Sequence, residues 1–417
     1  FGEFPAASIG WRISEESFMK DLTFINDMKL RASWGVTGNN NIGNYPSLAF
    51  VGINNYILNN SFAPGKVISS FANSSLKWEK SDQLDLGLDL ATFNNKLTFT
   101  FEYYRKLTND MLLPVSIPAV SGFTTSLDNI GQVENKGIEL SVDYRSNLGP
   151  VNFRTNLNIS ANRSTILAIK GANDMLYYGS FYGGYNVMKV GRPIGMIYGY
   201  KKLGIFNTQA EIDGWAKQDG VIPGGMKFAD TNGDGVVSYD TQDMVEIGNP
   251  NPDFTWGWTV AADYRNFDIN VLFVGAQNFD IYRNIEASTM NMDGVFNVLT
   301  KAKDRWRSAA NPGSNPNAKN SQGGTNYFKW SRESSERYVY DGSHIWLKAI
   351  TLGYTLPKLK SVFSDARIFF TANNLFLFTN YPGNNPDAGV RGGTDLNNDD
   401  ESYPVPRTLA VGIKLNL

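Results

Sequence analysis

The chain has 417 residues, and its 38 Lys and Arg against 40 Asp and Glu leave a net charge of −2, which implies no basic face for nucleic acid. It has no cysteine and one histidine, His344, which excludes disulfide frameworks, thiolate nucleophiles and Cys-type zinc sites and leaves His-dependent catalysis a single candidate. No run approaches the ~18–20 apolar residues of a membrane helix, which excludes a helical membrane protein. The first four residues form no signal peptide, so we expect a piece of a longer protein.

Alternating apolar and polar residues predict about eleven β-strands along the chain. Successive side chains of a strand point to opposite faces, so each segment has one apolar and one polar face. The lengths are near the ~9–11 residues of a tilted membrane-spanning strand, whereas strands of globular proteins average ~5–6. In chain order the predicted strands cover residues 9–13, 30–36, 84–90, 97–103, 138–144, 151–159, 254–260, 267–273, 346–354, 366–372 and 409–417.

Two neighbouring strands show the expected sidedness most clearly. Leucine occupies every second position from 84 to 90, and apolar residues alternate with polar ones from 97 to 103. We expect the apolar side chains to face lipid and the polar ones to face the lumen of a barrel. The residues expected to face lipid are Leu84, Leu86, Leu88, Leu90, Leu97, Phe99, Phe101 and Tyr103, and those expected to face the lumen are Asp85, Asp89, Thr98, Thr100 and Glu102.

The connections between the predicted strands alternate between short and long. The short ones cover residues 93–95, 147–150, 265–266 and 357–364, and the long ones cover 37–80, 105–137, 162–253, 277–343 and 376–406. Outer-membrane barrels have short periplasmic turns and longer extracellular loops, so this parity predicts an all-β, transmembrane antiparallel β-barrel with a periplasmic C-terminus. Single-chain bacterial barrels have even strand numbers, so about eleven strands should not close a barrel by themselves.

Aromatic residues lie within these strands or near their ends, where amphipathic rings favour the headgroup level of a membrane. Trp346 is expected to share a face with Ile350, Leu352 and Tyr354, and His344 is expected to be an interfacial residue. The other residues of this kind are Trp11, Trp34, Trp256, Trp258, Tyr103, Tyr104, Tyr144 and Tyr264. The alternative is that these rings fill the core of a soluble β-sandwich.

The segment from 230 to 241 begins like an EF-hand calcium loop. Oxygen donors stand at positions 1, 3 and 5, a glycine follows at position 6, and position 7 would offer its backbone carbonyl. Position 12 is Thr241, where the motif needs a bidentate acid, so a flanking acid would have to close the site. The sequence predicts either a structural calcium clip or a calcium-free turn in a surface loop. The residues expected to hold the ion are Asp230, Asn232, Asp234, Val236, Asp240 and Asp243.

The longest predicted loop, 162–253, carries a dense group of aromatic residues between 175 and 185 and a tryptophan further along. Exposed rings could stack on sugar faces or peptide side chains, and they could equally pack against neighbouring loops or a partner that covers the barrel. The candidates for contact with a substrate or a lid are Tyr177, Tyr178, Tyr182, Tyr185 and Trp215.

Residues for enzyme chemistry are scarce. The acidic run Asp399-Asp400-Glu401 stands in an Asn-, Asp- and Gly-rich loop and is interpreted as solvated charge rather than as a glycosidase pair. No glycine-rich phosphate loop follows a strand and opens a helix. We therefore expect neither enzymatic activity nor an organic cofactor.

Five stretches stand in an order that is typical of one family. They are residues 4–18, residues 25–35, residues 135–140, the run Asp230-Thr231-Asn232-Gly233-Asp234-Gly235 followed by residues 247–257, and residues 403–408. Together they resemble the C-terminal barrel region of the SusC/RagA family of TonB-dependent outer-membrane transporters. The chain departs from that pattern at two places, because the acid that closes the calcium-like loop comes about two residues late and the last residue, Leu417, is not aromatic.

The resemblance implies a multi-pass barrel of 22 strands in the bacterial outer membrane, of which residues 1–417 would form the last eleven or so, with 162–253 as a large extracellular loop. The plug domain, the TonB-contacting segment and the earlier strands would lie outside this sequence. A SusD-like surface lipoprotein would cap the barrel, which would capture oligosaccharides or oligopeptides, and TonB would displace the plug. The sequence does not decide between glycan and peptide.

Two other functions remain open at this point. One is an outer-membrane barrel that acts as an adhesin or assembly component without transport. The other is a secreted carbohydrate-active enzyme built on β-strands, which would be soluble in water, whereas the importer would need detergent. Co-purification of a lid lipoprotein and ligand-dependent uptake would favour the importer.

Overall fold

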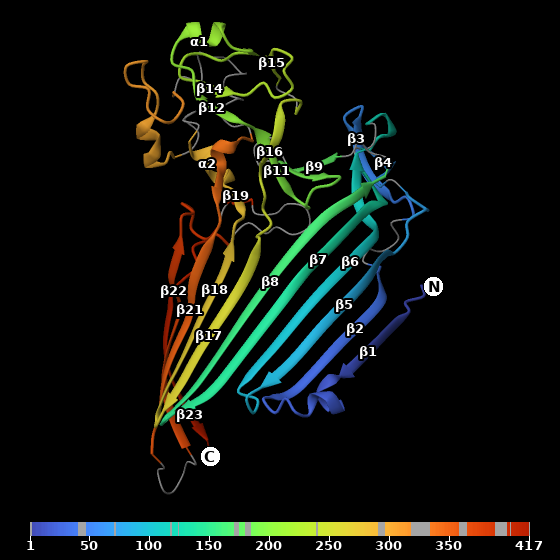
Figure 1. Ribbon diagram of the computed structural model, residues 1–417. Coiled ribbons are helices and arrows are strands. Elements are labelled where there is room, and N and C mark those ends of the chain that lie inside the picture. The colour runs from blue at the N-terminus through green and yellow to red at the C-terminus, as the bar shows by residue number, and fades with distance from the viewer. Residues whose placement is uncertain are drawn as a thin grey trace. The chain divides into compact units, whose positions relative to one another are not determined.

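The computed structural model shows a chain built almost wholly from β-strands (Figure 1). It describes residues 2–40, 47–70, 72–116, 119–123, 125–170, 175–179, 185–238, 241–290, 297–317, 334–357, 365–387, 398–400 and 402–416. Eleven strands form one large antiparallel sheet in the order β1-β2-β5-β6-β7-β8-β17-β18-β21-β22-β23. Their bounds are β1 Ala6–Arg12, β2 Ile25–Asn39, β5 Glu79–Thr92, β6 Leu97–Ser116, β7 Thr125–Leu148, β8 Val151–Ile169, β17 Phe254–Tyr264, β18 Phe267–Gln277, β21 His344–Thr355, β22 Asp365–Thr379 and β23 Thr408–Asn416. Among the described residues, no helix is long and apolar enough to cross a membrane.

Each of the eleven strands predicted from alternation corresponds to one strand of this sheet, so the predicted all-β class is confirmed. Several strands are longer than the alternation indicated. The expectation of a long loop over 105–137 is wrong, because β6 continues to Ser116 and β7 begins at Thr125. Polar residues follow the last clear alternation in these extensions, so the apolar pattern ends before the hydrogen-bonded ladder does.

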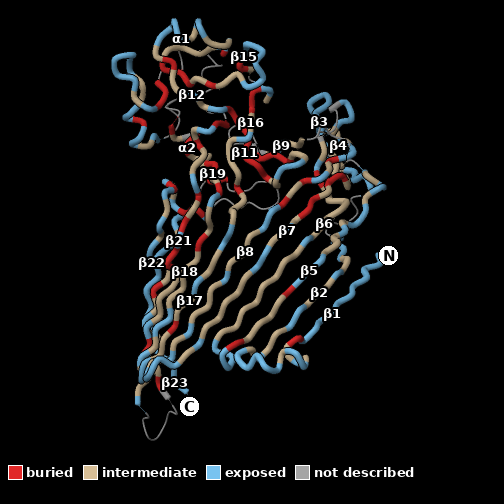
Figure 2. Tube along the Cα trace, viewed as in Figure 1, coloured by how far each residue is buried: buried red, intermediate tan, exposed pale blue. Residues whose placement is uncertain are grey.

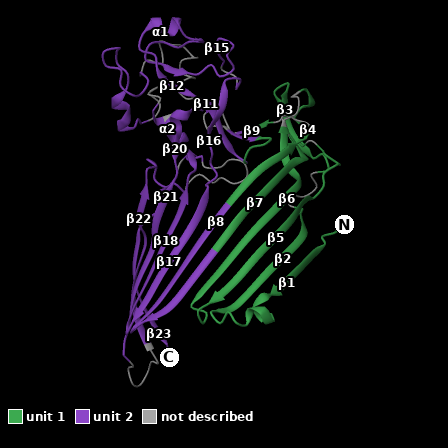
Figure 3. Cartoon of the chain, viewed as in Figure 1, with its two compact units in different colours: residues 1–140, 162–176, 189–193 green, residues 141–161, 177–188, 194–417 purple. Residues whose placement is uncertain are grey.

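The chain divides into two compact units (Figure 3). The first contains residues 1–140, 162–176 and 189–193, and the second contains residues 141–161, 177–188 and 194–417. Strands β1, β2, β5 and β6 belong to the first unit, and strands β17, β18, β21, β22 and β23 belong to the second.

In the first unit the strand register places apolar residues beside apolar residues. Leu88 pairs with Leu30 on one side and with Phe101 on the other, and Leu30 in turn pairs with Trp11. Asp89 pairs with Thr100, one position along, and therefore lies on the opposite face. The residues expected to face lipid thus share one face, and the polar residues between them share the other.

The second unit has the same two-faced construction. Trp258 of β17 pairs with Leu157 of β8 and with Phe273 of β18, and the Trp258 and Phe273 rings stack with their centroids 5.7 Å apart. Asp263, which has the other parity, lies beside Asn152 of β8. Alternation in the sequence therefore becomes one continuous apolar face within the unit.

One shift of register changes the sidedness of β21. The pairing of β21 with β22 skips between Leu347 and Ala349, and the pairing with β18 skips at the same place. Because an extra residue reverses the alternation beyond it, Trp346 lies on the opposite face from Ile350. Trp346 is also buried, so its expected place on the face of Ile350 is wrong.

The long connections fold into small elements of their own (Figure 2). In the second unit, β9 Met175–Gly179, which begins in the first unit, joins β10 Tyr185–Lys189, β11 Met196–Tyr200 and β16 Met244–Gly248 in a four-stranded sheet. Two-stranded pairs are formed by β12 Lys202–Ile205 with β14 Met226–Phe228, β13 Lys217–Gln218 with β15 Val236–Val237, and β19 Asp280–Tyr282 with β20 Val339–Asp341. The α-helices are α1 Gln209–Asp213 and α2 Asn284–Thr289, and β3 Val51–Leu58 with β4 Ser61–Ile68 form a hairpin in the first unit. Among the most deeply buried large side chains, Tyr200, Tyr282, Tyr338, Phe206 and Phe228 all lie in the long connections.

The large sheet ends in two edge strands, β1 and β23. Four apolar residues of β23 are about half exposed or more, with Val411 at 75%. The described strands thus form an open sheet, in agreement with the prediction that about eleven strands do not close a barrel.

Candidate functional site

The polar face of the first unit carries a cluster of charges centred on Arg31. Its Nε donates to Asp89 Oδ2 over 2.7 Å, and its Nη2 donates to Glu102 Oε1 over 2.7 Å. Gly87 lies beside Arg31 in the register, and a Cβ at Gly87 would come within 2.8 Å of the guanidinium carbon. The glycine therefore leaves the space that lets one guanidinium reach acids on two strands. These side chains are a third or more exposed, so the face they form is polar and accessible to water.

The polar face of the second unit has a comparable set of residues. Arg154 Nη2 donates to Asp263 Oδ2 over 2.9 Å, and Asn156 Nδ2 donates to Asp143 Oδ2 over 2.7 Å. A hollow of about 210 Å³ lies among these strands, and Arg145 is one of the residues that line it. Both units thus combine an apolar face suited to lipid with a hydrogen-bonding face suited to water and polar solutes.

The calcium-like loop forms a series of tight turns. The two carboxylate oxygens of Asp230 accept the backbone N–H groups of Gly233 and Gly235 at 2.7 and 2.8 Å. Asp243 is fully buried and accepts the N–H of Thr231 at 3.0 Å and that of Ser238 at 2.7 Å.

The other expected ligands lie around these turns. Asn232 and Asp234 accept the N–H groups of Asp234 and Val236 at 2.9 and 2.8 Å, and Val236 is exposed. Asp240 lies outside the described residues. Within the described part of the chain, no three acidic or histidine side chains converge in a group that could hold a metal ion. Asp230 and Asp243 thus brace the loop through its own backbone.

The loop aromatics differ in how much they expose. Tyr177 is 38% exposed and packs edge-on against Tyr198, with 6.1 Å between the ring centroids. Burial raises the pKa of Tyr178 to about 12. Tyr182 lies outside the described residues, and so does the side chain of Tyr185, whose backbone begins β10.

Trp215 is held by its own loop. The indole Nε1 donates to the carbonyl of Phe228 over 3.1 Å, and the Lys227 ammonium lies 3.8 Å from the ring centroid. The indole N–H and one face of the ring are therefore occupied by neighbouring residues of the loop.

A buried carboxylate for which the sequence analysis predicts no role connects three parts of the loop region. Glu286 of α2 is 1% exposed and accepts hydrogen bonds from Lys301 Nζ at 2.7 Å, Arg283 Nη1 at 2.9 Å and the Tyr340 hydroxyl at 2.8 Å. Burial opposes its ionisation, yet these hydrogen bonds outweigh burial and hold the pKa of Glu286 below its usual range. The local sequence signal was the i, i+3 spacing of Arg283 and Glu286, which is common in surface helices.

Two expectations for polar residues near the sheet are wrong. His344 is not interfacial but 4% exposed, with Nδ1 2.9 Å from the Gly342 carbonyl and Nε2 3.1 Å from Asp387 Oδ1. Asp399, expected as solvated charge, is buried and accepts the hydroxyl of Tyr381. In both cases the residue binds a segment from another part of the chain, which a local pattern does not reveal.

A family profile described as "TonB dependent receptor-like, beta-barrel" matches residues 2–375. The chain belongs to this family. Its members are multi-pass β-barrels of the outer membrane, which agrees with the two-faced sheet and with the SusC/RagA resemblance.

Individual relatives agree with this assignment. "TonB-dependent receptor P3" of Formosa agariphila is 35% identical over 99% of this chain and 41% of that protein, and "TonB-dependent receptor SusC" of Bacteroides thetaiotaomicron is 28% identical over 100% of this chain and 40% of that protein. The solved structure titled "Structure of the RagAB peptide transporter" superposes with a TM-score of 0.82 at 25% identity, over 99% of this chain and 43% of that one. The chain spans about two fifths of the length of these relatives.

Proposed function

We propose that this chain is the C-terminal part of the wall of an energised outer-membrane importer for oligosaccharides or oligopeptides. The observation that carries the proposal is the pairing of an apolar face with a charged, water-accessible face along strands of a TonB-dependent receptor-like barrel. An apolar outer face is what insertion into lipid requires, and a polar inner face is what passage of a hydrophilic solute requires. A plug, a TonB-contacting segment and further strands would come from residues before Phe1, and the C-terminus would lie in the periplasm.

A protein partner on the long-loop side is supported by the β3–β4 hairpin. Val51, Ile53 and Ile57 share one face of it with Phe62 and Ile68, by the register of the pair. All five are more than half exposed, and Ile53 and Phe62 reach 79% and 81%. Residues 47–70 contain one charged side chain, that of Lys66, which pairs with Ile53 on this same face.

An isolated two-stranded hairpin is marginal in water, and exposed apolar patches commonly mark protein contacts. We assign this hairpin face to a SusD-like surface lipoprotein that caps the barrel. The SusC/RagA resemblance, which implies a surface lipoprotein over the barrel, supports this assignment, and the relative named SusC and the structure titled "Structure of the RagAB peptide transporter" are both similar to this chain.

Calcium in the 230–243 loop is a separate part of the proposal. Asp230 and Asp234 lie four residues apart in the same series of tight turns, and a bound cation would offset the repulsion between their carboxylates. The ion would be a structural clip. We assign no organic cofactor and no enzymatic activity.

Uptake by cells tests the function. Cells that express the full-length protein and its lid would be given a mixture of oligopeptides and oligosaccharides, and depletion of each component from the medium would be followed by mass spectrometry. We expect selective depletion that stops when TonB is removed. Cell-surface binding without depletion would instead support an adhesin or assembly role.

Lid docking can be tested with a pair of hairpin variants. Ile53→Asp on the apolar face should reduce co-purification of the lipoprotein. Tyr56→Ser on the opposite face of the same hairpin is the control and should leave co-purification unchanged. Equal recovery of the lipoprotein with both variants would remove the hairpin from the docking surface.

A further inference from the structure

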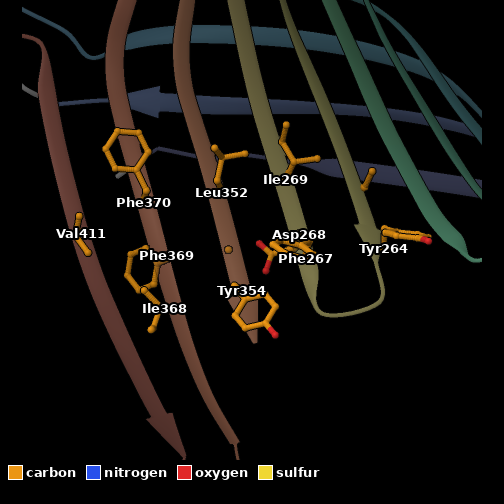
Figure 4. A pocket seen from close by; sticks show the side chains of 12 residues that line it. Tyr264, Phe267, Asp268, Ile269, Leu352, Tyr354, Ile368, Phe369, Phe370 and Val411 are labelled. Carbon is orange, nitrogen blue, oxygen red and sulfur yellow. The ribbon is translucent and has the colours of Figure 1, made fainter. Parts of the chain in front are cut away.

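The apolar face of the second unit contains a hollow close to the short turn between β17 and β18. The hollow has a volume of about 460 Å³ and is lined by residues of β17, β18, β21, β22 and β23. Figure 4 shows the side chains of Ile269, Leu352 and Phe370 on neighbouring strands. The volume lies within the ~300–1,000 Å³ typical of small-molecule sites.

A small residue between large ones opens this hollow. Ala262 of β17 pairs with Phe153 on one side and with Ile269 on the other. Its methyl group leaves a recess between bulkier side chains. Towards the turn, the rings of Phe267 and Tyr354 stand with their centroids 4.7 Å apart and bound the recess.

The chemistry of the recess is that of a hydrocarbon site with a polar rim. Asp268 is its one acidic lining residue, and that carboxylate is paired with Arg367 across Gly353 on the polar face of the sheet. At the turn, Arg265 is exposed and its guanidinium carbon lies 5.3 Å from the centroid of the Tyr264 ring. A cation and tyrosine rings therefore stand where the apolar surface ends.

Aromatic residues at the end of a membrane-spanning strand mark the headgroup level, and apolar surface beyond them contacts acyl chains. A phosphate at this level would meet the Arg265 guanidinium, and the chain attached to it would run along the recess. An oligosaccharide or peptide in transit would follow the opposite, polar face and would not reach it.

We propose that this hollow is a specific phospholipid site, with one acyl chain between Ile269, Leu352 and Phe370 and the lipid phosphate on Arg265. The inference rests on the proposed placement of the sheet in the outer membrane. It goes beyond transport, because it assigns a bound lipid to a defined place on the wall.

Native mass spectrometry of the full-length protein tests the site. Delipidated protein in mild detergent would be titrated with phosphatidylglycerol and, separately, with diacylglycerol, which lacks the phosphate. We expect one tightly retained phosphatidylglycerol, weaker retention of diacylglycerol, and no displacement by inorganic phosphate. Arg265→Gln should weaken retention of phosphatidylglycerol about tenfold, the loss of one charge-assisted contact, and leave diacylglycerol unchanged.

Two further variants complete the design. Ala262→Phe fills the recess and should abolish retention of both lipids. Lys96→Gln removes an exposed cation from the short turn between β5 and β6, which contributes no residue to the lining of the hollow, and should have no effect.

Three outcomes would overturn the site. The first is equal retention of phosphatidylglycerol by the wild type, Arg265→Gln and Ala262→Phe, and the second is displacement of the lipid by inorganic phosphate. The third is a wild type that retains no lipid, with Ala262→Phe changing only the oligomeric state. The readout is bound lipid rather than uptake. A protein that failed the import test could therefore still show the site occupied.

Discussion

Replacing Glu286 with glutamine should loosen the loop region of the second unit without disturbing the sheet. The substitution removes the charge that Arg283 and Lys301 share while nearly preserving the shape of the side chain. Arg283 is 15% exposed and would stay largely buried without its anion, whereas Lys301 is 49% exposed and can recover water. Loss of the charged partner of the buried Arg283 should lower the stability of the loop region by about 2–3 kcal/mol, and the loss at the half-exposed Lys301 adds little.

Hydrogen exchange measures this cost directly. The N–H of Arg283 donates to the carbonyl of Tyr338 at 2.8 Å, and the N–H of Met290 donates to that of Glu286 at 2.9 Å. If both amides exchange by local opening, a loss of about 2–3 kcal/mol accelerates them roughly 30- to 150-fold. Amides of β17 and β18 should keep their rates.

Glu336→Gln, an exposed acid in the same loop region, is the matched control and should change nothing. Exchange at Arg283 and Met290 that is equal in both variants would refute the reasoning. The pH dependence adds a second check. The pKa of Glu286 is lower in the folded protein than in the unfolded chain. Its contribution to the stability of the loop region is therefore fully present at a pH above the ordinary pKa of a glutamate, and it is lost as the pH falls through the lowered pKa. Wild-type exchange should therefore approach that of Glu286→Gln in acid.

Three further predictions concern the sheet and the calcium-like loop. Leu88→Arg should lower the free energy of unfolding by roughly 2–4 kcal/mol if Leu88 lies near the bilayer midplane. The folded fraction in lipid vesicles would be followed against urea concentration, and an unchanged unfolding midpoint would place Leu88 away from lipid. Gly87→Val should displace the Arg31 guanidinium and destabilise the sheet by about 1–3 kcal/mol, and a wild-type urea midpoint would show that the space beside Gly87 is not needed. Asp230→Ala with Asp234→Ala should make the loop sensitive to protease and insensitive to calcium, whereas identical cleavage of the wild type with and without chelator would leave only a calcium-free turn.

Local alternation was sufficient to locate the strands of the large sheet. Period two is a property of neighbouring residues, and in a sheet with one apolar face it also fixes the register, as in the pairing of Leu88 with Leu30 and Phe101. Alternation failed where the ladder departs from regularity. Nothing in the residues around Lys348 marks the skipped position that turns Trp346 to the other face.

The folded long loops were much less accessible to prediction. Glu286 meets Tyr340, 54 residues away in the sequence, only because α2 and β20 are brought together, and it meets Lys301 from a third segment 15 residues away. Trp215 was a candidate for contact, and its indole is satisfied by Phe228 and Lys227 of its own loop. These contacts join loop segments that have no periodic pattern of apolar residues. The sequence therefore shows that charged and aromatic residues are present in the loops, but it does not show which residues they contact.

The sidedness of β5 in a membrane shows directly whether this chain forms the wall of a transport barrel. Residues 1–417 contain no cysteine, so Asp85→Cys, Leu86→Cys, Leu88→Cys and Asp89→Cys each provide one attachment point for a nitroxide label within them. The reconstituted full-length protein without an added cysteine is the labelling control. Collision of each label with oxygen, which concentrates in lipid, and with a water-soluble nickel complex would be compared. We expect labels at positions 86 and 88 to respond to oxygen and labels at positions 85 and 89 to respond to the nickel complex. The reverse order, or no alternation along the strand, would contradict a membrane wall with a polar transport path on its inner face.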